Sequence, residues 1–180
     1  MVFTHDTEMA LQSAVILANS AGQQADTLTT VADLDVIWDE FSYTGRHERT
    51  TAELDSVRAI RGRLRDLLTA DRVAAVDIVN AWLSEAGAVP QLVRHDELDW
   101  HIHAIDLEAP LADRIIVETA MAMVDVIRAD EMSRLDICAD DTCEDVVLDL
   151  SRNRSRRFCS TTCGNRNAVA AYRARQSTGG

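Results

Sequence analysis

Residues 138–166 read CADDTCEDVVLDLSRNRSRRFCSTTCGNR and contain all four cysteines of the chain. The cysteines form two close pairs, Cys138-x4-Cys143 and Cys159-x3-Cys163, and fifteen residues separate the pairs. Two such pairs are the typical ligand set of a structural zinc site, in which each pair forms a turn, or knuckle, beside the metal. The spacing therefore predicts a Zn²⁺ ion held by four thiolates, in a closed site that stabilises the fold and leaves no position open for catalysis.

Three other uses of four cysteines remain open. They are two disulfides, four free thiols, and an iron–sulfur cluster with the same ligands. Residues 1–6 show no basic segment followed by an apolar run, so we expect no secretory signal and a cytoplasmic protein. Disulfides are rare in that reducing compartment, which favours the metal. No apolar run is long enough to cross a bilayer, so we expect no membrane partner.

The charged residues divide the chain into two parts. Residues 1–149 hold 11 Arg against 30 Asp and Glu, whereas residues 150–180 hold 7 Arg and no acid, and the two parts sum to the net charge of −12. The basic part is the one able to approach a polyanion such as double-stranded DNA. From charge alone, a solvated tail or a tail docked on the acidic body explains the pattern equally well.

The arginines surround the second cysteine pair. Residues 165–176 predict a short helix opened by Gly164-Asn165, on which Arg166 and Arg173 lie two turns apart on one face. That face suits a phosphate backbone, and Arg and Asn side chains can reach base edges. The acidic first knuckle, with Asp140 and Asp141, should face away from the nucleic acid. The predicted DNA-contacting residues are Arg152, Arg154, Arg156, Arg157, Asn165, Arg166, Arg173 and Arg175.

The residues before the finger predict a mostly helical domain. Apolar residues recur at helical spacing in about 6–21, 31–41, 54–68, 73–83 and 111–134. Thr50 and Glu53 have the spacing of a capping box, and Asp71 is a good cap for the helix that follows it. On that helix we expect Val73, Val76, Val79 and Leu83 to form the buried face.

A short period-2 segment follows Pro90. Leu98, Trp100 and Ile102 alternate with polar residues, which predicts a half-buried strand, and residues 91–94 are its candidate hairpin partner. His101 and His103 share one face and are weak candidates for binding a ligand or metal. Without a third converging ligand, we interpret them as a solvent-exposed polar face. Trp38, Trp82 and Trp100 are expected in the core.

These patterns predict an α+β fold in two parts. A predominantly α-helical domain with a small β-hairpin covers residues 1–134, and a small zinc-binding domain with an arginine-rich helix covers residues 135–180. Residues 145–150 alternate like one strand of a short hairpin that joins the two knuckles.

The motifs of the second part resemble a known family. SRNRSRRFCS at 151–160, CGNR at 163–166 and AAYRAR at 170–175 closely resemble the CGNR zinc finger over about residues 135–176. LDWHIH at 98–103, leading through Pro110 into an Ala-rich helix, resembles the ABATE domain that precedes this finger in bacterial stress-induced transcriptional regulators. The resemblance implies zinc at Cys138, Cys143, Cys159 and Cys163, DNA binding by the C-terminal segment, and a small ligand for the N-terminal domain.

We therefore expect a zinc-dependent, DNA-binding transcription regulator. Its N-terminal domain would sense a small ligand or mediate dimerisation, because one short finger reads few base pairs and specificity favours a homodimer. The alternative is a zinc-thiolate redox sensor or protein-interaction module that does not bind DNA. No nucleophile elbow, phosphate loop or dinucleotide loop is present, so we do not expect an enzyme.

Overall fold

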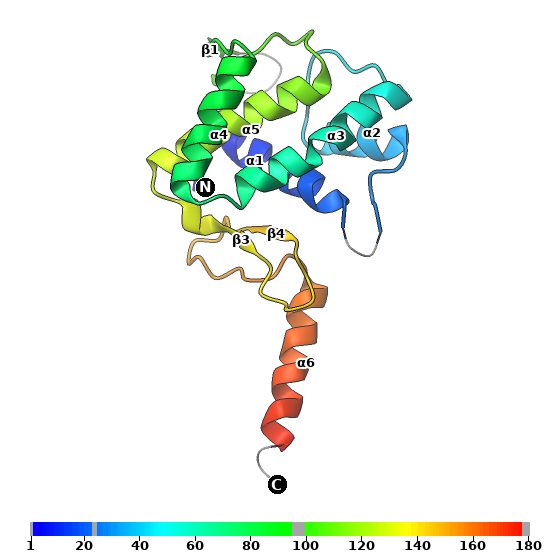
Figure 1. The fold of residues 1–180 in the computed structure, drawn as a ribbon, viewed down its shortest axis with the longest axis vertical. Coiled ribbons are helices and arrows are strands. Elements are labelled where there is room, and N and C mark those ends of the chain that lie inside the picture. Colours follow the sequence, from blue (N-terminus) through cyan, green and yellow to red (C-terminus); the bar gives the residue numbers. More distant parts are fainter. Residues whose placement is uncertain (1, 23–24, 95–99, 178–180) are drawn as a thin grey trace.

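A computed structural model describes residues 2–22, 25–94 and 100–177 (Figure 1). The helices are α1 His5–Ser20, α2 Val31–Glu40, α3 Thr51–Leu68, α4 Arg72–Glu85, α5 Leu111–Arg128 and α6 Thr161–Ser177, with a 3₁₀ turn at Met132–Arg134. The strands are β1 Gln91–Val93, β2 His101–His103, β3 Leu135–Ile137 and β4 Val146–Leu148. They pair as two antiparallel hairpins, β1 with β2 and β3 with β4. The predicted α+β class is confirmed.

Helix α5 is the main packing partner in the helical body, where it contacts α1, α3 and α4. Its apolar residues recur at helical spacing, and Leu111, Ile115 and Met123 are almost fully buried. Burying a side chain of this size stabilises the fold by about 1.5–3 kcal/mol. Within the described ranges, none of the helices combines the length and hydropathy that crossing a bilayer requires.

The helix caps differ in part from the sequence prediction. The Asp71 carboxylate accepts hydrogen bonds from the N–H groups of the first turn of α4, as expected. The Thr50 hydroxyl accepts from the Glu53 N–H, but the Glu53 carboxylate accepts from the N–H groups of Glu48 and Arg49 and does not close the box. A complete capping box stands instead before α2, between Thr30 and Asp33.

The predicted buried face of α4 was wrong in two positions. Val73 is 74% exposed and Val76 is 36% exposed. The buried residues are Ala75, Val79 and Trp82, which lie at i, i+4 and i+7 on the side that packs against α5. The helix is apolar around much of its circumference, so periodicity did not select the face that meets its neighbour.

The β1–β2 hairpin was predicted, but its orientation was not. Leu92 pairs with Ile102 in the register, and Ile102 is 43% exposed. Trp100, expected in the core, is 63% exposed. His101 and His103 are the half-buried members of β2. The polar face of the strand therefore turns inward, while Leu98 and Asp99 lie outside the described residues.

The long helix that follows Pro110 is shorter than predicted. α5 ends at Arg128 rather than near Arg134, because Asp130 takes a left-handed conformation with φ of 58° and a 3₁₀ turn follows. This turn redirects the chain into β3. It carries Arg134, which is buried and donates a hydrogen bond of 2.8 Å to the Asp149 carbonyl beyond β4.

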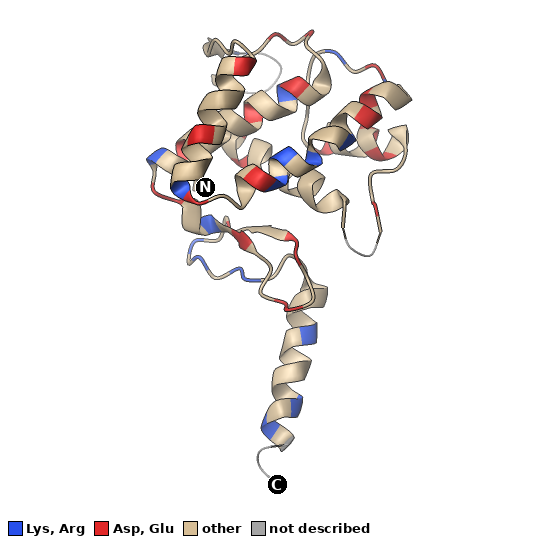
Figure 2. Cartoon of the chain, in the orientation of Figure 1, with Lys and Arg blue, Asp and Glu red and all other residues tan. Residues whose placement is uncertain are grey.

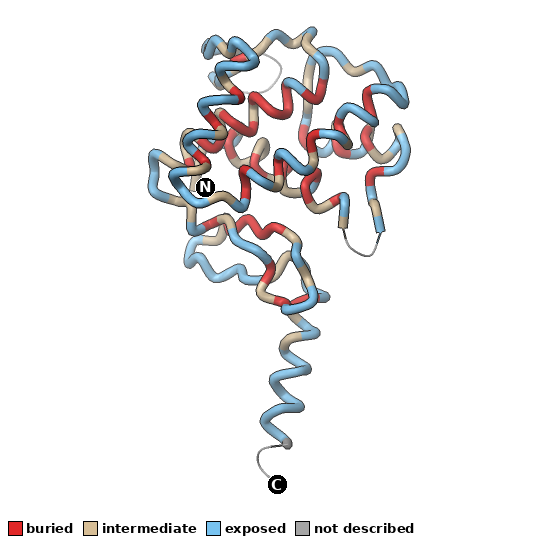
Figure 3. Tube along the Cα trace, viewed as in Figure 1, coloured by how far each residue is buried: buried red, intermediate tan, exposed pale blue. Residues whose placement is uncertain are grey.

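The β3–β4 hairpin packs directly on the helical body. Val146 and Leu148 belong to the same hydrophobic core as the buried residues of α1. The Asn19 amide of α1 binds the backbone of Val146 twice, donating to its carbonyl at 2.9 Å and accepting from its N–H at 2.8 Å. By contrast, α6 projects away from the body and is exposed along nearly all its length (Figures 1 and 3).

Candidate zinc centre and nucleic-acid interface

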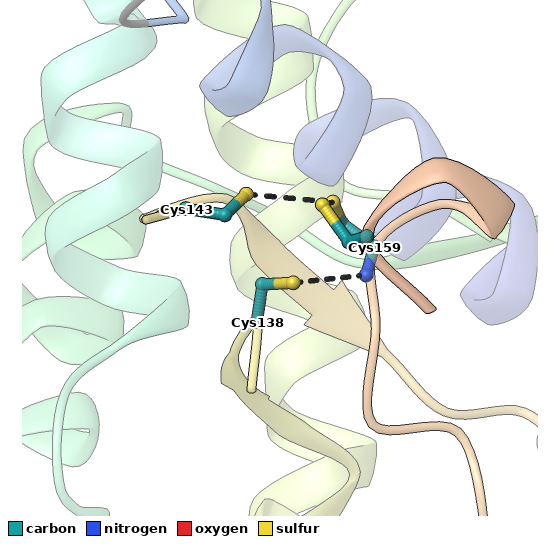
Figure 4. A group of neighbouring side chains, drawn as sticks. Cys138, Cys143 and Cys159 are labelled. Atoms are coloured by element: carbon teal, nitrogen blue, oxygen red, sulfur yellow. Dashed lines mark hydrogen bonds between the residues drawn. The ribbon is translucent and has the colours of Figure 1, made fainter. Parts of the chain in front are cut away.

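The four cysteines converge on one point between the β3–β4 hairpin and the start of α6. Cys138 follows β3 and Cys143 precedes β4, while Cys159 precedes α6 and Cys163 lies in its first turn. All four sulfur atoms lie within 4.8 Å of one another. The Sγ atoms of Cys143 and Cys159 are 3.6 Å apart (Figure 4). Those of Cys159 and Cys163 are 3.7 Å apart.

These distances fit a tetrathiolate zinc site. With Zn–S bonds of about 2.3 Å, the edge of a regular S4 tetrahedron is about 3.8 Å. A disulfide requires about 2.05 Å between sulfur atoms, and all four cysteines are free thiols here. The donor set is all sulfur, which suits zinc or an iron–sulfur cluster and excludes the hard cations that prefer oxygen.

Backbone geometry holds the knuckles in place. In the first knuckle the Cys138 N–H donates to the Asp145 carbonyl at 2.8 Å, and the Cys143 N–H donates to the Asp140 carbonyl at 2.8 Å. The second pair is tied to the first because the Cys159 N–H donates to the Cys138 sulfur at 3.4 Å (Figure 4). Cys138 is therefore bonded both to the end of the first knuckle, through its N–H, and to the second knuckle, through its sulfur.

The thiols depend on a cation to ionise together. Burial raises the pKa of Cys143 to about 11 and raises that of Cys159 as well. At Cys138 burial also opposes ionisation, but N–H groups that donate to its sulfur bring the pKa below the ordinary value. A divalent ion at the centre supplies the missing positive charge, so its binding releases protons from the buried thiols.

Asp140 is a structural centre that the sequence analysis missed. Its side chain is 3% exposed and accepts from the Thr142 N–H at 2.9 Å, from Arg166 at 3.1 Å and from the Asn167 amide at 2.9 Å. The Thr142 hydroxyl also donates to the Asp140 carboxylate, and this bond, together with the others, holds the pKa of the carboxyl below the ordinary value. Asp140 therefore fixes the start of α6 to the first knuckle, whereas sequence reasoning assigned it only a repulsion of phosphate.

Helix α6 begins at Thr161, four residues before the predicted start. The Ser160 hydroxyl accepts from the Cys163 N–H at 3.3 Å, in the manner of an N-cap. Cys163 therefore lies in the first turn of the helix, and the metal cluster sits at its N-terminal end. The direction of α6 is fixed by the cluster and by Asp140 together.

Three of the predicted DNA-contacting arginines already have partners within the chain. Arg154 forms an ion pair of 2.8 Å with Glu131, and Arg156 donates to the Cys159 carbonyl at 3.0 Å. Arg166 pairs with Asp140 and also donates to the Thr142 hydroxyl. These side chains help to hold the finger together, which does not by itself test whether they touch DNA.

The other predicted contacts lie open on the surface. Within the described residues, the side chains of Arg152, Arg157, Asn165 and Arg173 are exposed and make no hydrogen bond or ion pair. Arg175 is exposed near the end of α6. Figure 2 shows acidic residues spread over the helical body, whereas the only charged residues on α6 are basic.

His101 and His103 are not solvent-exposed, contrary to our interpretation of the sequence. Both are half-buried, their Nε2 atoms are 2.9 Å apart, and both line a pocket of about 410 Å³ in the helical body. Among the described residues, the four cysteines form the one group of three or more His, Cys, Asp or Glu placed to hold a metal ion. The histidines are therefore pocket residues rather than a second metal site.

Two family models match the chain. The model of the CGNR zinc finger matches residues 134–176, and the ABATE model, described as "Putative stress-induced transcription regulator", matches residues 12–130. No curated protein matches the chain. The finger match and the converging cysteines together identify a zinc-binding site. Both matches are to regulator or zinc-finger types and neither is to an enzyme family.

Proposed function

This chain belongs to the ABATE family of transcription regulators and carries a CGNR zinc finger, and from that premise we propose that it binds duplex DNA through its C-terminal segment. The observation that carries the proposal is the placement of the basic charge. Helix α6 projects from the body, bears arginines and no acid, and is held at its base by the cysteine cluster. An exposed, positively charged helix suits the phosphate backbone.

Zinc has a structural role in this proposal. Cys138, Cys143, Cys159 and Cys163 are assigned as the ligands, and the ion supplies the charge that keeps their thiolates together. The chain's own residues then set the direction of α6, through Asp140 and its bonds to Arg166. We also propose that the two domains meet at residue 134 and that the protein acts as a homodimer.

The N-terminal part is proposed to sense a small ligand. The pocket of about 410 Å³ is large enough for a small organic molecule. Helix α1 offers a physical link to the finger, because Thr7 and Met9 at one end line the pocket and Asn19 at the other end holds β4. A ligand that shifts α1 would therefore shift the base of the finger.

The DNA-binding proposal is tested by the salt dependence of affinity. Fluorescence anisotropy with a labelled 30-base-pair duplex should give a slope of log affinity against log salt of roughly −3 to −6, at about −0.9 per neutralised phosphate. The triple variant Arg152→Ala, Arg157→Ala, Arg173→Ala should bind more weakly and with a slope less steep by about 0.9 for each lost contact.

The matched control for the single variant Arg173→Ala is Arg128→Ala. Arg128 is exposed at the end of α5 on the acidic body, so its loss changes the net charge equally without touching α6. Arg166 is unsuitable as a test residue because it also supports the finger through Asp140. DNA binding by this segment would be refuted by a DNA affinity that does not change with salt concentration. Equal DNA affinities of the triple variant and the wild type would refute it as well.

A further inference from the structure

The pocket in the helical body has an apolar wall. It lies between the start of α1, the loop after α2, strand β2 and helix α5, and its apolar side chains come from all four. They include Met9, Phe41, Ile102, Val117 and Met121. A cavity of this size and lining suits a small organic molecule with an apolar body more than it suits an inorganic ion.

The formal charges on the wall are predominantly acidic. Asp6, Glu118 and Asp125 line the pocket, the chain contains no lysine, and no arginine is among the described lining residues. The basic side chains there are histidines. The 2.9 Å contact between the Nε2 atoms of His101 and His103 requires one donor and one acceptor, so at least one of these rings is neutral.

Two of the three carboxyl groups on this wall lack a partner among the described residues: Asp6, in the first turn of α1, and Glu118, in the middle of α5 between buried residues. Asp125 accepts a hydrogen bond of 2.7 Å from the Thr7 hydroxyl, whereas Glu118 makes no hydrogen bond or ion pair with any described residue. Arg114, one turn earlier on α5, favours the ionised form of Glu118 from a distance. Its guanidinium is committed elsewhere, because it donates to the carbonyls of Ala109, Thr44 and Arg46.

A half-buried carboxylate needs a donor or a cation, and residues 2–22, 25–94 and 100–177 supply neither to Glu118. Burial raises the pKa of Glu118 to about 7, which reflects the same lack. An ammonium group would provide both the positive charge and the N–H donors. Phe41, Tyr43 and Trp100 place aromatic rings on the same wall. Such rings attract a cation to their faces and also contact the apolar part of a ligand.

We propose that this pocket binds a small organic cation with an apolar body, a hydrophobic amine, whose ammonium group pairs with Glu118. The inference rests on the ligand-sensing part of the proposed function and adds the chemical class of the ligand. The proposal predicts that the pocket discriminates between ligands of the same shape by their charge. A neutral molecule of the same shape leaves Glu118 unpaired, and an anion of that shape meets three carboxyl groups on the wall.

The test is calorimetric titration of the full-length, zinc-loaded protein at pH 8. The probes are 2-phenylethylamine and octylamine, with 2-phenylethanol as the neutral match and phenylacetate as the anionic match. We expect both amines to bind at least tenfold more tightly than the neutral and anionic probes. Glu118→Gln should weaken amine binding at least tenfold and leave the affinity for 2-phenylethanol within about twofold.

The control variant is Asp113→Asn, which removes an exposed carboxylate from the same helix and should leave amine affinity unchanged. The inference is overturned if neither amine binds, if phenylacetate or 2-phenylethanol binds as tightly as the amines, or if Glu118→Gln binds amines like the wild type. DNA affinity of the same protein is measured in parallel. DNA binding without amine binding would refute this inference and leave the DNA-binding proposal standing.

Discussion

Replacing Glu118 by Gln should make the protein more stable at neutral and alkaline pH. In the unfolded chain the carboxyl group has an ordinary pKa of 4.5, whereas burial beside the pocket raises it to about 7. Between these values the unfolded chain releases the proton and the folded chain keeps it, so rising pH favours unfolding. A difference of about 2.5 corresponds to at most about 3 kcal/mol, because one pKa unit is worth 1.36 kcal/mol.

Urea denaturation of wild type and Glu118→Gln at pH 5 and pH 8 measures this effect. Gln has nearly the same shape as Glu and carries no charge, so the variant escapes the cost of ionisation at pH 8. We expect its free energy of unfolding, relative to wild type, to rise by about 2–3 kcal/mol between the two pH values. The difference in unfolding free energy between the variant and the wild type should stop changing above about pH 7, where Glu118 is ionised in both the folded and the unfolded chain.

Comparing the two proteins removes the contributions of other titrating groups. Arg114 acts on Glu118 through its charge, and His5, His101 and His103 line the same pocket, but all of them are present in both proteins. The zinc site is shared as well. A stability difference that is the same at pH 5 and pH 8 would refute the reasoning, since it would show that Glu118 ionises alike in the folded and unfolded chain.

Three further changes test the contacts that hold the finger and one tight backbone contact in the helical body. Asn19→Ala removes both hydrogen bonds to the Val146 backbone, and thermal or urea denaturation should show a loss of about 1–3 kcal/mol; an unchanged midpoint would mean that the hairpin does not depend on α1. Asp140→Ala removes the ion pair of Arg166, and transfer of zinc to a colorimetric chelator should become faster than in wild type, whereas equal rates would contradict the supporting role of Asp140. Gly45→Ala should destabilise the fold by more than about 1 kcal/mol in urea, because φ is 89° and a Cβ would collide with the Leu107 carbonyl; wild-type stability would exclude this geometry.

The cysteine cluster was largely predictable because its information is local. Two close pairs in a tail without other cysteines have few ways to meet, so spacing alone indicated the four residues that the structure brings within 4.8 Å. The Asp71 cap was predictable for the same reason, since its carboxylate acts only two and three residues away. The predicted capping box at Thr50 is incomplete, because the Glu53 carboxylate accepts hydrogen bonds from Glu48 and Arg49, which precede the helix.

The role of Asp140 could not be read from sequence, because its partners are distant in the chain. Arg166 lies 26 residues away, and only folding decides whether the pair meets. The sequence offered the opposite reading, a repulsive acidic knuckle. The same holds for Arg154, whose partner Glu131 belongs to the turn after α5.

The sequence by itself determined the α+β composition, most of the helices, the pairing of β1 with β2 and the convergence of the cysteines, because periodicity, caps and short spacings act over a few residues. It indicated a strand at 145–150 but not its partner β3, which precedes the first knuckle. Tertiary structure alone decided which face of α4 is buried, that β2 turns His101 and His103 inward, and that Glu118 faces a pocket without a partner. Amphipathic patterns define faces but not the neighbours that those faces meet. Burial, and with it the pKa of a carboxyl group, depends on packing between elements far apart in the chain.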